Sequence, residues 1–159
     1  MEATAIVYVS NTGYTAAYAG LLGKQTGLPV YPLAEAEKAL PKGERILFLG
    51  WLMAGFLRGY RKAARRFRIQ AAYGVGLGDT GSQVETVRRT NRIPAGTALY
   101  TLQGGMDHAR LTGVYKSMIN TLIRTMSAKK NRTPDEDRML ELLIQGGCYV
   151  SEENLKKCR

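Results

Sequence analysis

Apolar and polar positions alternate in blocks along the chain, and each block has the length of a strand or of a helix. The strand-like blocks are short apolar runs bounded by glycine, proline or polar residues; they are residues 5–9, 28–33, 45–50, 69–77 and 97–102. Runs of this length without helical periodicity are typical of strands buried in a sheet. Pro29 and Pro32 keep the second segment extended, because proline disfavours helix at its own position and at the one before it.

The helix-like blocks repeat apolar residues at helical spacing. They are residues 16–25, 34–40, 55–67, 83–90 and 111–126. After a basic linker at residues 129–132, Thr133 with Pro134 and Glu136 predicts the start of another helix, because this pattern forms a capping box with proline in the first turn. The Gly-Gly pair at residues 146–147 predicts the end of that helix.

Strands that alternate with helices predict a parallel sheet with helices on both faces, because parallel strands need crossover connections and those are right-handed. We therefore expect one three-layer α/β domain over residues 1–159 with a five-stranded sheet. The long periodic helix at residues 111–126 carries an apolar stripe that we expect to lie on the core of this domain. Residues 129–159 then form a charged helical extension, in which Ser151 predicts the start of a last short helix.

The chain has 159 residues and a formal charge of +10, which favours anionic partners. Its 45% hydrophobic content is ordinary for a globular domain and argues against disorder. Residues 1–4 lack the layout of a signal peptide, and no apolar run approaches the roughly 20 residues of a membrane span. The two cysteines are too sparse for a disulfide framework or a zinc site. We therefore expect a cytoplasmic protein without a membrane span.

Much of the positive charge lies in one segment that we expect to be helical. Its basic residues are Arg58, Arg61, Lys62, Arg65, Arg66 and Arg68. At helical spacing most of them share one face, which is either a solvated surface or a docking surface for an acidic partner. Neither this segment nor the smaller clusters at residues 88–92 and 129–132 has the interleaved aromatics of a nucleic-acid platform, so a nucleic-acid partner is not expected.

The first strand ends in a turn that has the chemistry of an anion site. Ser10, Thr12 and Thr15 supply hydroxyl groups around the permissive Gly13, and a helix follows. The N–H groups and the dipole of a first helical turn favour negative charge. The turn has no lysine and no acidic residue to hold a metal ion, which separates it from the phosphate loop of nucleoside triphosphatases. It is suited to one terminal phosphate held by neutral donors.

Four loops follow the predicted strands and meet at one rim, because the carboxyl ends of parallel strands share an edge. They are residues 10–15, 51–55, 76–82 and 103–108. The second loop begins at Trp51, the only tryptophan in the chain, and an apolar loop beside a phosphate site suits a flat conjugated ring attached to a phosphate. Packing in the core is the alternative role for Trp51. The glycines of the third loop have the wrong spacing for a dinucleotide fingerprint.

Residues 10–15 (Ser-Asn-Thr-Gly-Tyr-Thr) resemble the Ser/Thr-x-Thr-Gly-x-Thr phosphate loop of the flavodoxin family. Residues 76–79 (Gly-Leu-Gly-Asp) resemble the Gly-x-Gly-Asp with which the fourth strand of that family ends. Residues 103–107, which lead into the methionine-rich helix, are similar to the flavodoxin-like quinone-dependent protoporphyrinogen oxidases. The resemblance covers roughly residues 5–126 and implies a flavodoxin-like fold with strand order 2-1-3-4-5 and FMN as the cofactor.

The resemblance also implies which residues hold FMN. The phosphate would be held by the first loop, whose residues are Ser10, Asn11, Thr12, Gly13, Tyr14 and Thr15. One side of the isoalloxazine would be flanked by Trp51, Leu52, Met53, Ala54 and Gly55. The other side would be lined by Gly78, Asp79, Thr80 and Gly81. In the family the backbone after strand three adjusts to the flavin redox state, a role that residues 53–55 would take through the flexible glycine.

Three features depart from the family pattern. The loop after the fourth strand, at residues 79–82, lacks the aromatic residue that often stacks on the flavin. The basic charge is opposite to the acidic surface usual for electron-carrier flavodoxins. The extension at residues 129–159 has no counterpart in the short flavodoxins. Because a basic surface repels partners that dock on acidic carriers, the redox partner expected here is an acidic protein.

Three functions remain as hypotheses. The first is an FMN-binding electron-transfer protein, in which the flavin carries the chemistry. The second is an FMN-dependent oxidoreductase of the protoporphyrinogen oxidase type, whose basic rim receives an anionic small-molecule substrate. The third is a flavodoxin-shaped module without flavin that binds an acidic partner through its basic helix.

Overall fold

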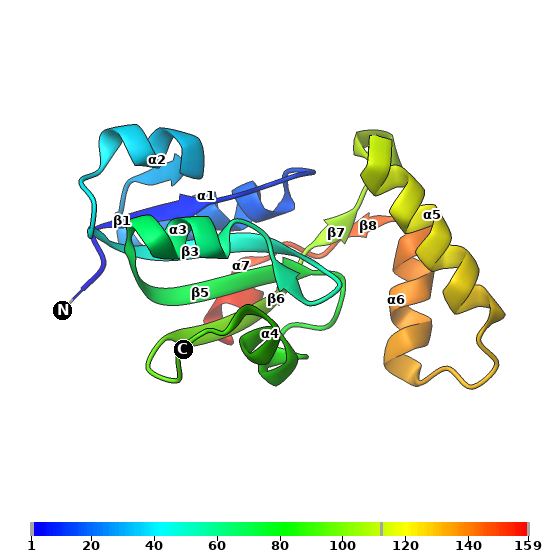
Figure 1. Cartoon of the computed structure of the whole chain (residues 1–159). Coiled ribbons are helices and arrows are strands. Elements are labelled where there is room, and N and C mark those ends of the chain that lie inside the picture. Colours follow the sequence, from blue (N-terminus) through cyan, green and yellow to red (C-terminus); the bar gives the residue numbers. More distant parts are fainter. Residues whose placement is uncertain (1, 112, 159) are drawn as a thin grey trace.

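The computed structural model describes residues 2–111 and 113–158, and in it a parallel sheet separates two layers of helices (Figure 1). The strands of this sheet are β1 (Ala5–Tyr8), β2 (Val30–Pro32), β3 (Arg45–Met53), β5 (Arg68–Gly76) and β6 (Ala98–Gln103), with β4 (Phe56–Leu57) paired to β3. The order is β2-β1-β3-β5-β6, and each neighbouring pair on this path is parallel. When these five strands are counted along the chain, the order is 2-1-3-4-5, so the predicted fold class is confirmed.

Side chains of each strand alternate between two apolar cores, one on each face of the sheet. On β1, Ala5 and Val7 lie in one core and Ile6 lies in the other. Phe48 and Leu49 on β3 repeat the pattern, and neither has any exposed surface. Helices cover both faces: the first core lies under α2 (Leu33–Ala39), α3 (Tyr60–Arg66) and α4 (Val84–Asn91), and the second under α1 (Tyr14–Thr26) and α7 (Glu152–Lys156). Burial on both faces explains why the strands are continuous apolar runs.

The segment predicted as a helix over residues 55–67 begins as a strand. Phe56–Leu57 forms β4, which runs back antiparallel to the end of β3 after a two-residue turn. The turn residues Ala54 and Gly55 both have positive φ, 52° and 82°, which is typical of a type I′ hairpin turn. The helix starts only after Gly59, whose φ of 85° keeps it outside the helical region. The prediction of a continuous helix was therefore wrong in its first third.

The long helix predicted at residues 111–126 forms, but its apolar stripe does not lie on the sheet. α5 (Gly113–Ala128) packs against α6 (Pro134–Gln145), and the two project beyond the carboxyl ends of the strands as a helical hairpin (Figure 1). Their apolar sides form a third core around Met106, Ile119 and Leu143. Periodicity shows that a helix buries one side but not against which partner, so the pattern alone predicts the wrong neighbour for α5.

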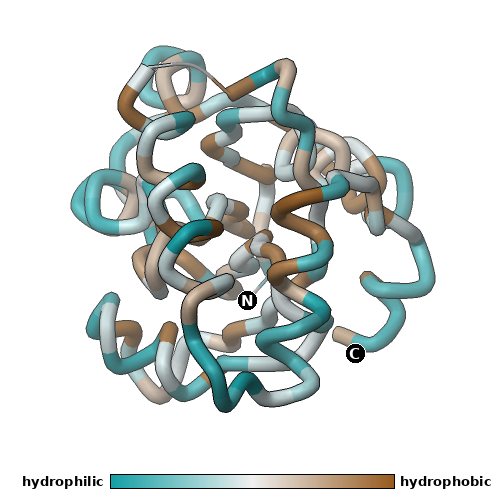
Figure 2. The backbone as a smooth tube through the Cα atoms, turned by 90° about the vertical axis from the view of Figure 1, so that its right-hand side faces the viewer, coloured by the Kyte–Doolittle hydropathy of each residue, from teal (hydrophilic) through white to brown (hydrophobic). Residues whose placement is uncertain are grey.

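Two short strands join the helical hairpin to the sheet domain. β7 (Gly105–Met106) leads into the hairpin through η1 (His108–Arg110), and β8 (Gly147–Cys148) pairs antiparallel with β7 where the chain returns. Seen from the side of the hairpin, hydrophobic and hydrophilic residues alternate along its helices, as amphipathic helices require (Figure 2). Within the described residues, no helix combines the length and the apolar character needed to cross a membrane.

The predicted start of α6 is confirmed in detail. The Thr133 side chain accepts a hydrogen bond from the backbone N–H of Glu136 at 3.1 Å, and the Glu136 carboxylate accepts one from the N–H of Thr133 at 3.0 Å. This capping box satisfies two of the N–H groups that a helix start leaves without a partner. Lys129 then binds the same carboxylate at 2.7 Å, which closes the connection between α5 and α6.

The last part of the chain belongs to the sheet domain. α7 packs on α1 and β6, and Leu155 is only 3% exposed in the second core beside Tyr18. The Tyr18 hydroxyl donates to the Gln103 carbonyl and accepts from the Asn154 amide at 3.0 Å. Burial raises the pKa of Tyr18, which keeps this hydroxyl protonated as a donor. The charged extension thus supplies the helix that completes one face of the sheet.

Candidate functional site

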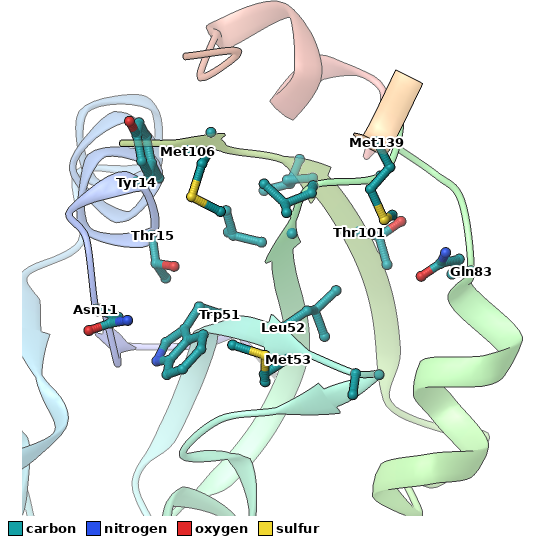
Figure 3. Close-up of a pocket in the computed structure, with 18 of the residues that line it drawn as sticks. Asn11, Tyr14, Thr15, Trp51, Leu52, Met53, Gln83, Thr101, Met106 and Met139 are labelled. Carbon is teal, nitrogen blue, oxygen red and sulfur yellow. The ribbon is translucent and has the colours of Figure 1, made fainter. Parts of the chain in front are cut away.

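A cavity of about 470 Å³ lies between the carboxyl ends of the strands and the helical hairpin (Figure 3). Its volume is within the range of about 300–1,000 Å³ found for ligand pockets. All four loops predicted at this rim contribute to its wall. The predicted site residues that line it are Asn11, Thr12, Tyr14, Thr15, Trp51, Leu52, Met53, Ala54, Gly55, Gly78 and Asp79. The structure therefore brings together side chains from each of the three segments that the resemblance assigns to FMN.

The first loop is shaped by Ser10, which is not among the residues that line the cavity. The Ser10 hydroxyl oxygen accepts hydrogen bonds from the backbone N–H groups of Gly13 at 3.2 Å and Ala16 at 3.3 Å. Gly13 is the N-cap of α1 with a φ of 98°, a conformation that favours glycine. These bonds fix the loop from within the protein and use two of the N–H groups near the start of α1.

The same loop has hydrogen-bond donors for which the described part of the chain provides no acceptor. Among the described residues, none accepts a hydrogen bond from the backbone N–H groups of Tyr14 and Thr15. The Thr15 side chain is 2% exposed, borders the cavity near Asn11 (Figure 3), and has no hydrogen-bond partner among these residues. Because buried polar groups are normally hydrogen-bonded, a hydroxyl in this position needs a ligand or a water in the cavity. The start of α1 thus presents neutral donors, the chemistry predicted for a phosphate site.

A cationic group also reaches this loop, and the sequence pattern missed it. Arg110 at the end of η1 donates through Nη1 to the Thr12 carbonyl at 2.7 Å, and a Cβ atom on Gly13 would lie 2.9 Å from that nitrogen. Asp107 holds the guanidinium from its other side, with Oδ2 3.3 Å from Nε. A charged side chain thus lies beside the neutral donors of the loop. No local signal could reveal the contact, since its two residues are 98 positions apart.

Trp51 lies in the wall of the cavity and belongs to none of the buried apolar cores. β3 extends to Met53, so the first part of the predicted loop, residues 51–53, continues the strand. The indole meets the Tyr115 ring edge-on at 5.2 Å between centroids, and the Arg58 guanidinium lies 5.6 Å from the indole centroid. Tyr115 on α5 thus packs against Trp51, but it does not line the cavity and does not replace the aromatic residue that the loop after β5 lacks.

The turn between β3 and β4 is clamped by a buried side chain that sequence analysis did not single out. Asn91 is 5% exposed, and its amide nitrogen donates to the carbonyls of Gly55 at 2.9 Å and Val87 at 2.8 Å. Its oxygen accepts from the backbone N–H of Leu57 at 2.8 Å. Two of these partners are 34 and 36 positions away in the chain, so no local pattern indicates the clamp.

In the second half of the loop after β5, Thr80 and Gly81 do not line the cavity, whereas Ser82 does. The Thr80 hydroxyl oxygen accepts from the backbone N–H of Gln103 at 2.9 Å, and the Gly81 N–H donates to the Thr101 carbonyl at 3.0 Å. Both bonds tie this half of the loop to β6. Of the residues assigned to the second side of the flavin, only residues 78–79 therefore border the cavity.

The segment after β6 gives the cavity an apolar roof that was not predicted. Its lining side chains are Met106, Leu111, Ile119, Leu122 and Met139. Arg138 on α6 donates to the Asp79 carboxylate at 2.9 Å, and this bond raises the pKa of Arg138. Within the described part of the chain, the lining contains no lysine or arginine, so the basic rim expected for an anionic substrate lies outside this cavity.

The segment predicted as one basic helical face is divided between structural and exposed roles. Arg66 donates through Nη2 to two carbonyls near the end of α2 at 2.8 and 3.1 Å. Lys62 lies 3.5 Å from the Glu37 carboxylate. Arg61 and Arg65 are exposed on α3. The surface that could meet an acidic partner is thus smaller than the count of basic residues suggests.

No family model matches the chain, and neither a curated protein nor a solved structure is significantly similar to it. Membership of the flavodoxin family therefore stays a prediction, although the strand order is the one that the resemblance implies.

Proposed function

We propose that the protein binds FMN in this cavity and passes electrons through it. The observation that carries the proposal is that a phosphate-type turn borders an apolar cavity. Donors for which the described residues provide no acceptor lie at the start of α1, and Trp51 stands in the wall near Asn11 (Figure 3). Bound FMN would supply the redox chemistry, while the protein binds, orients and encloses it.

The donor set at the first loop fits a phosphate group. The backbone N–H groups of Tyr14 and Thr15 and the hydroxyls of Thr12 and Thr15 would hold the phosphate oxygens, supported by the dipole of α1. The loop contains no acidic side chain that would repel them. This arrangement supports a single terminal phosphate and gives no support to a triphosphate with its metal ion.

The remaining wall fits a flat ring. Leu52 packs over two glycines of β5, where a Cβ atom on Gly74 would lie 3.1 Å from Leu52 and one on Gly76 would lie 3.2 Å from it. The missing side chains let Leu52 lie close to the sheet, which leaves space above the carboxyl ends of the strands. Trp51 and the apolar roof then border that space with surfaces that suit an aromatic ligand.

One observation favours a second candidate, an FMN-dependent oxidoreductase that acts on a small molecule. The helical hairpin covers the rim at which the edge of a bound ring would otherwise meet a protein partner, and its lining is apolar. A partly covered apolar cavity suits a small reactant better than electron transfer between two proteins. The protoporphyrinogen oxidase type is the form of this candidate that the sequence resemblance suggests.

Titration with FMN tests the first proposal. Trp51 is the only tryptophan, so a bound flavin is expected to quench a single protein emission while the flavin fluorescence also falls. In Trp51→Leu the flavin signal should still report binding, with an affinity lower by roughly threefold to tenfold because one aromatic contact is lost. A purified protein without visible flavin absorption, whose tryptophan emission is unchanged by added FMN, would contradict the proposal.

The two candidates differ in what oxidises the reduced protein. FMN-loaded protein is reduced without oxygen and mixed either with an acidic electron-transfer protein or with a small water-soluble quinone. Fast reoxidation by the protein acceptor that slows with added salt supports the electron carrier. Fast reoxidation by the quinone alone, independent of salt, supports the small-molecule oxidoreductase.

A further inference from the structure

We propose that Arg110 selects the phosphorylated flavin. Its side chain is not among those that line the cavity, but it contacts the carbonyl of Thr12, which is. From there its guanidinium supplies the positive charge that the first loop lacks, so that the cavity prefers FMN over riboflavin, which has the same ring system without the phosphate. This inference rests on the proposed FMN binding, because it concerns the phosphate end of the same site.

Arg110 is held against the loop in a defined orientation. Its Nη1 atom donates to the Thr12 carbonyl at 2.7 Å, and its Nε atom lies 3.3 Å from Oδ2 of Asp107. The other carboxylate oxygen of Asp107 accepts from the Ala109 N–H at 3.0 Å, which orients the carboxylate itself. For Nη2 the described residues provide no acceptor. A guanidinium presents five donors in a rigid fork, so this orientation leaves a second nitrogen for a phosphate oxygen.

Thr15 independently marks this end of the cavity as a ligand site. Its side chain is 2% exposed, borders the cavity, and has a hydroxyl without a partner in the described part of the chain. Thr12 connects the two features, because it lines the cavity and carries the carbonyl that Arg110 binds. Gly13 lies between them, and the absence of a side chain there lets the guanidinium approach the loop. A phosphate at the start of α1 would therefore lie beside Arg110.

Charge explains why this residue distinguishes the two ligands. A phosphate monoester carries between one and two negative charges at neutral pH, whereas riboflavin carries none there. The loop residues provide only neutral donors, and hydrogen bonds from a charged donor are roughly twice as strong as neutral ones. The Arg110 side chain is 59% exposed and shares its charge with Asp107, so solvent screening limits the effect to about tenfold in affinity.

The test compares FMN with riboflavin in three variants, with binding followed by the quenching of flavin fluorescence. Arg110→Gln removes the charge, Arg110→Lys keeps the charge without the fork, and Arg61→Gln removes one charge from the exposed face of α3 as the matched control. We expect Arg110→Gln to weaken FMN binding by about tenfold and to change riboflavin binding by less than about twofold. Arg110→Lys should lie between wild type and Arg110→Gln, and Arg61→Gln should match wild type. Added salt should lower the ratio of FMN affinity to riboflavin affinity more in wild type than in Arg110→Gln.

If Arg110→Gln lowers the affinities for FMN and riboflavin equally, Arg110 only holds the Thr12 carbonyl in place, and the inference is overturned. Unchanged FMN binding in Arg110→Gln would overturn it as well, while leaving FMN as the ligand. A wild-type protein that binds neither flavin would overturn both proposals. Thermal unfolding of each variant shows whether the fold is intact, and it should be, because the Arg110 side chain is more than half exposed.

Discussion

The two walls of the cavity are held in place by different kinds of contact. The sheet wall, formed by the end of β3 and the turn to β4, is fixed by Asn91, which is 5% exposed and hydrogen-bonded through both atoms of its amide. The helical roof, formed by α5 and α6, is tied to the opposite rim by Arg138 and Asp79, whose side chains are 55% and 49% exposed. An exposed ion pair contributes about 0–1 kcal/mol, whereas an unpaired buried polar group costs about 1–3 kcal/mol.

From this difference we expect the helical roof, and not the sheet wall, to move if the cavity opens. The roof also leaves apolar surface uncovered, because Val114 is 71% exposed and Met118 is 43% exposed on α5. A region with exposed attachments and uncovered apolar surface opens locally at a lower free energy than a region fixed by buried hydrogen bonds. A ligand that enters the cavity should therefore pass the roof and leave the sheet wall unchanged.

The largest effect is expected from breaking the clamp of the sheet wall. Asn91→Leu keeps a side chain of similar size but leaves the Leu57 N–H and the Gly55 carbonyl without their partner in a buried place. We expect the free energy of unfolding to fall by about 3 kcal/mol, measured by chemical denaturation. Asn120→Leu, on the exposed side of α5, is the matched control and should change it by less than about 0.5 kcal/mol. An equal loss of unfolding free energy in Asn91→Leu and Asn120→Leu would show that the buried clamp does not hold the sheet wall more firmly than the roof is held.

A smaller effect is expected from alkaline pH, and it concerns the sheet core. Burial raises the pKa of Tyr73 to about 12, so between pH 10 and 12 the unfolded chain releases a proton that the folded protein retains. The unfolded state then binds fewer protons, and the free energy of unfolding falls as pH rises, by about 2 kcal/mol for this group. Denaturation curves across this range should show the fall, and Tyr73→Phe should flatten it. A slope that is the same in Tyr73→Phe would assign the alkaline loss to other groups.

The smallest effect is expected from acid, and it concerns the roof. The hydrogen bond from Lys129, followed by that from the Thr133 N–H, holds the pKa of Glu136 below its ordinary value near 4.5. A carboxyl with a lowered pKa stabilises the folded state above 4.5, and this contribution is lost as pH falls through the lowered pKa. Hydrogen exchange should then show the start of α6 opening before the sheet does. In Glu136→Gln, the hydrogen exchange of α6 should no longer depend on acid. If the amides of α6 stay as protected from exchange in acid as those of β3, the roof is not more weakly attached than the sheet wall.

Much of the sheet domain was predictable because its signals are local. The apolar runs mark the strands, and Thr133 with Glu136 predicts the capping box that the structure contains. The path of α5 was not predictable in this way. Its apolar stripe is real, but the choice between the sheet and α6 as its partner depends on where the chain returns through β8 and α7. The same holds for β4, whose pairing with β3 overrides the helical spacing of residues 55–67.

The candidate site likewise has residues that the sequence predicted and residues that it did not. The loop residues from Asn11 to Thr15 and from Trp51 to Gly55 were predicted because strand ends and turn chemistry can be recognised within a few positions. Arg110, Asn91 and Tyr115 were missed because each acts on a segment far away in the chain. Their spacing to the loops they contact carries no pattern, and their residue types are common on helices and turns. Such supporting residues can be identified only from the folded structure, in which distant segments of the chain are in contact.

The pairing of β7 with β8 places the two ends of the helical hairpin side by side. Gly105 lies opposite Cys148 and Met106 lies opposite Gly147, so about forty residues leave and rejoin the domain at nearly one point. We expect a unit joined in this way to tolerate lengthening or shortening without a shift of β6 or α7. The same unit carries both the apolar roof and Arg110, so a change in it would alter the lining of the cavity and the charge beside the first loop together.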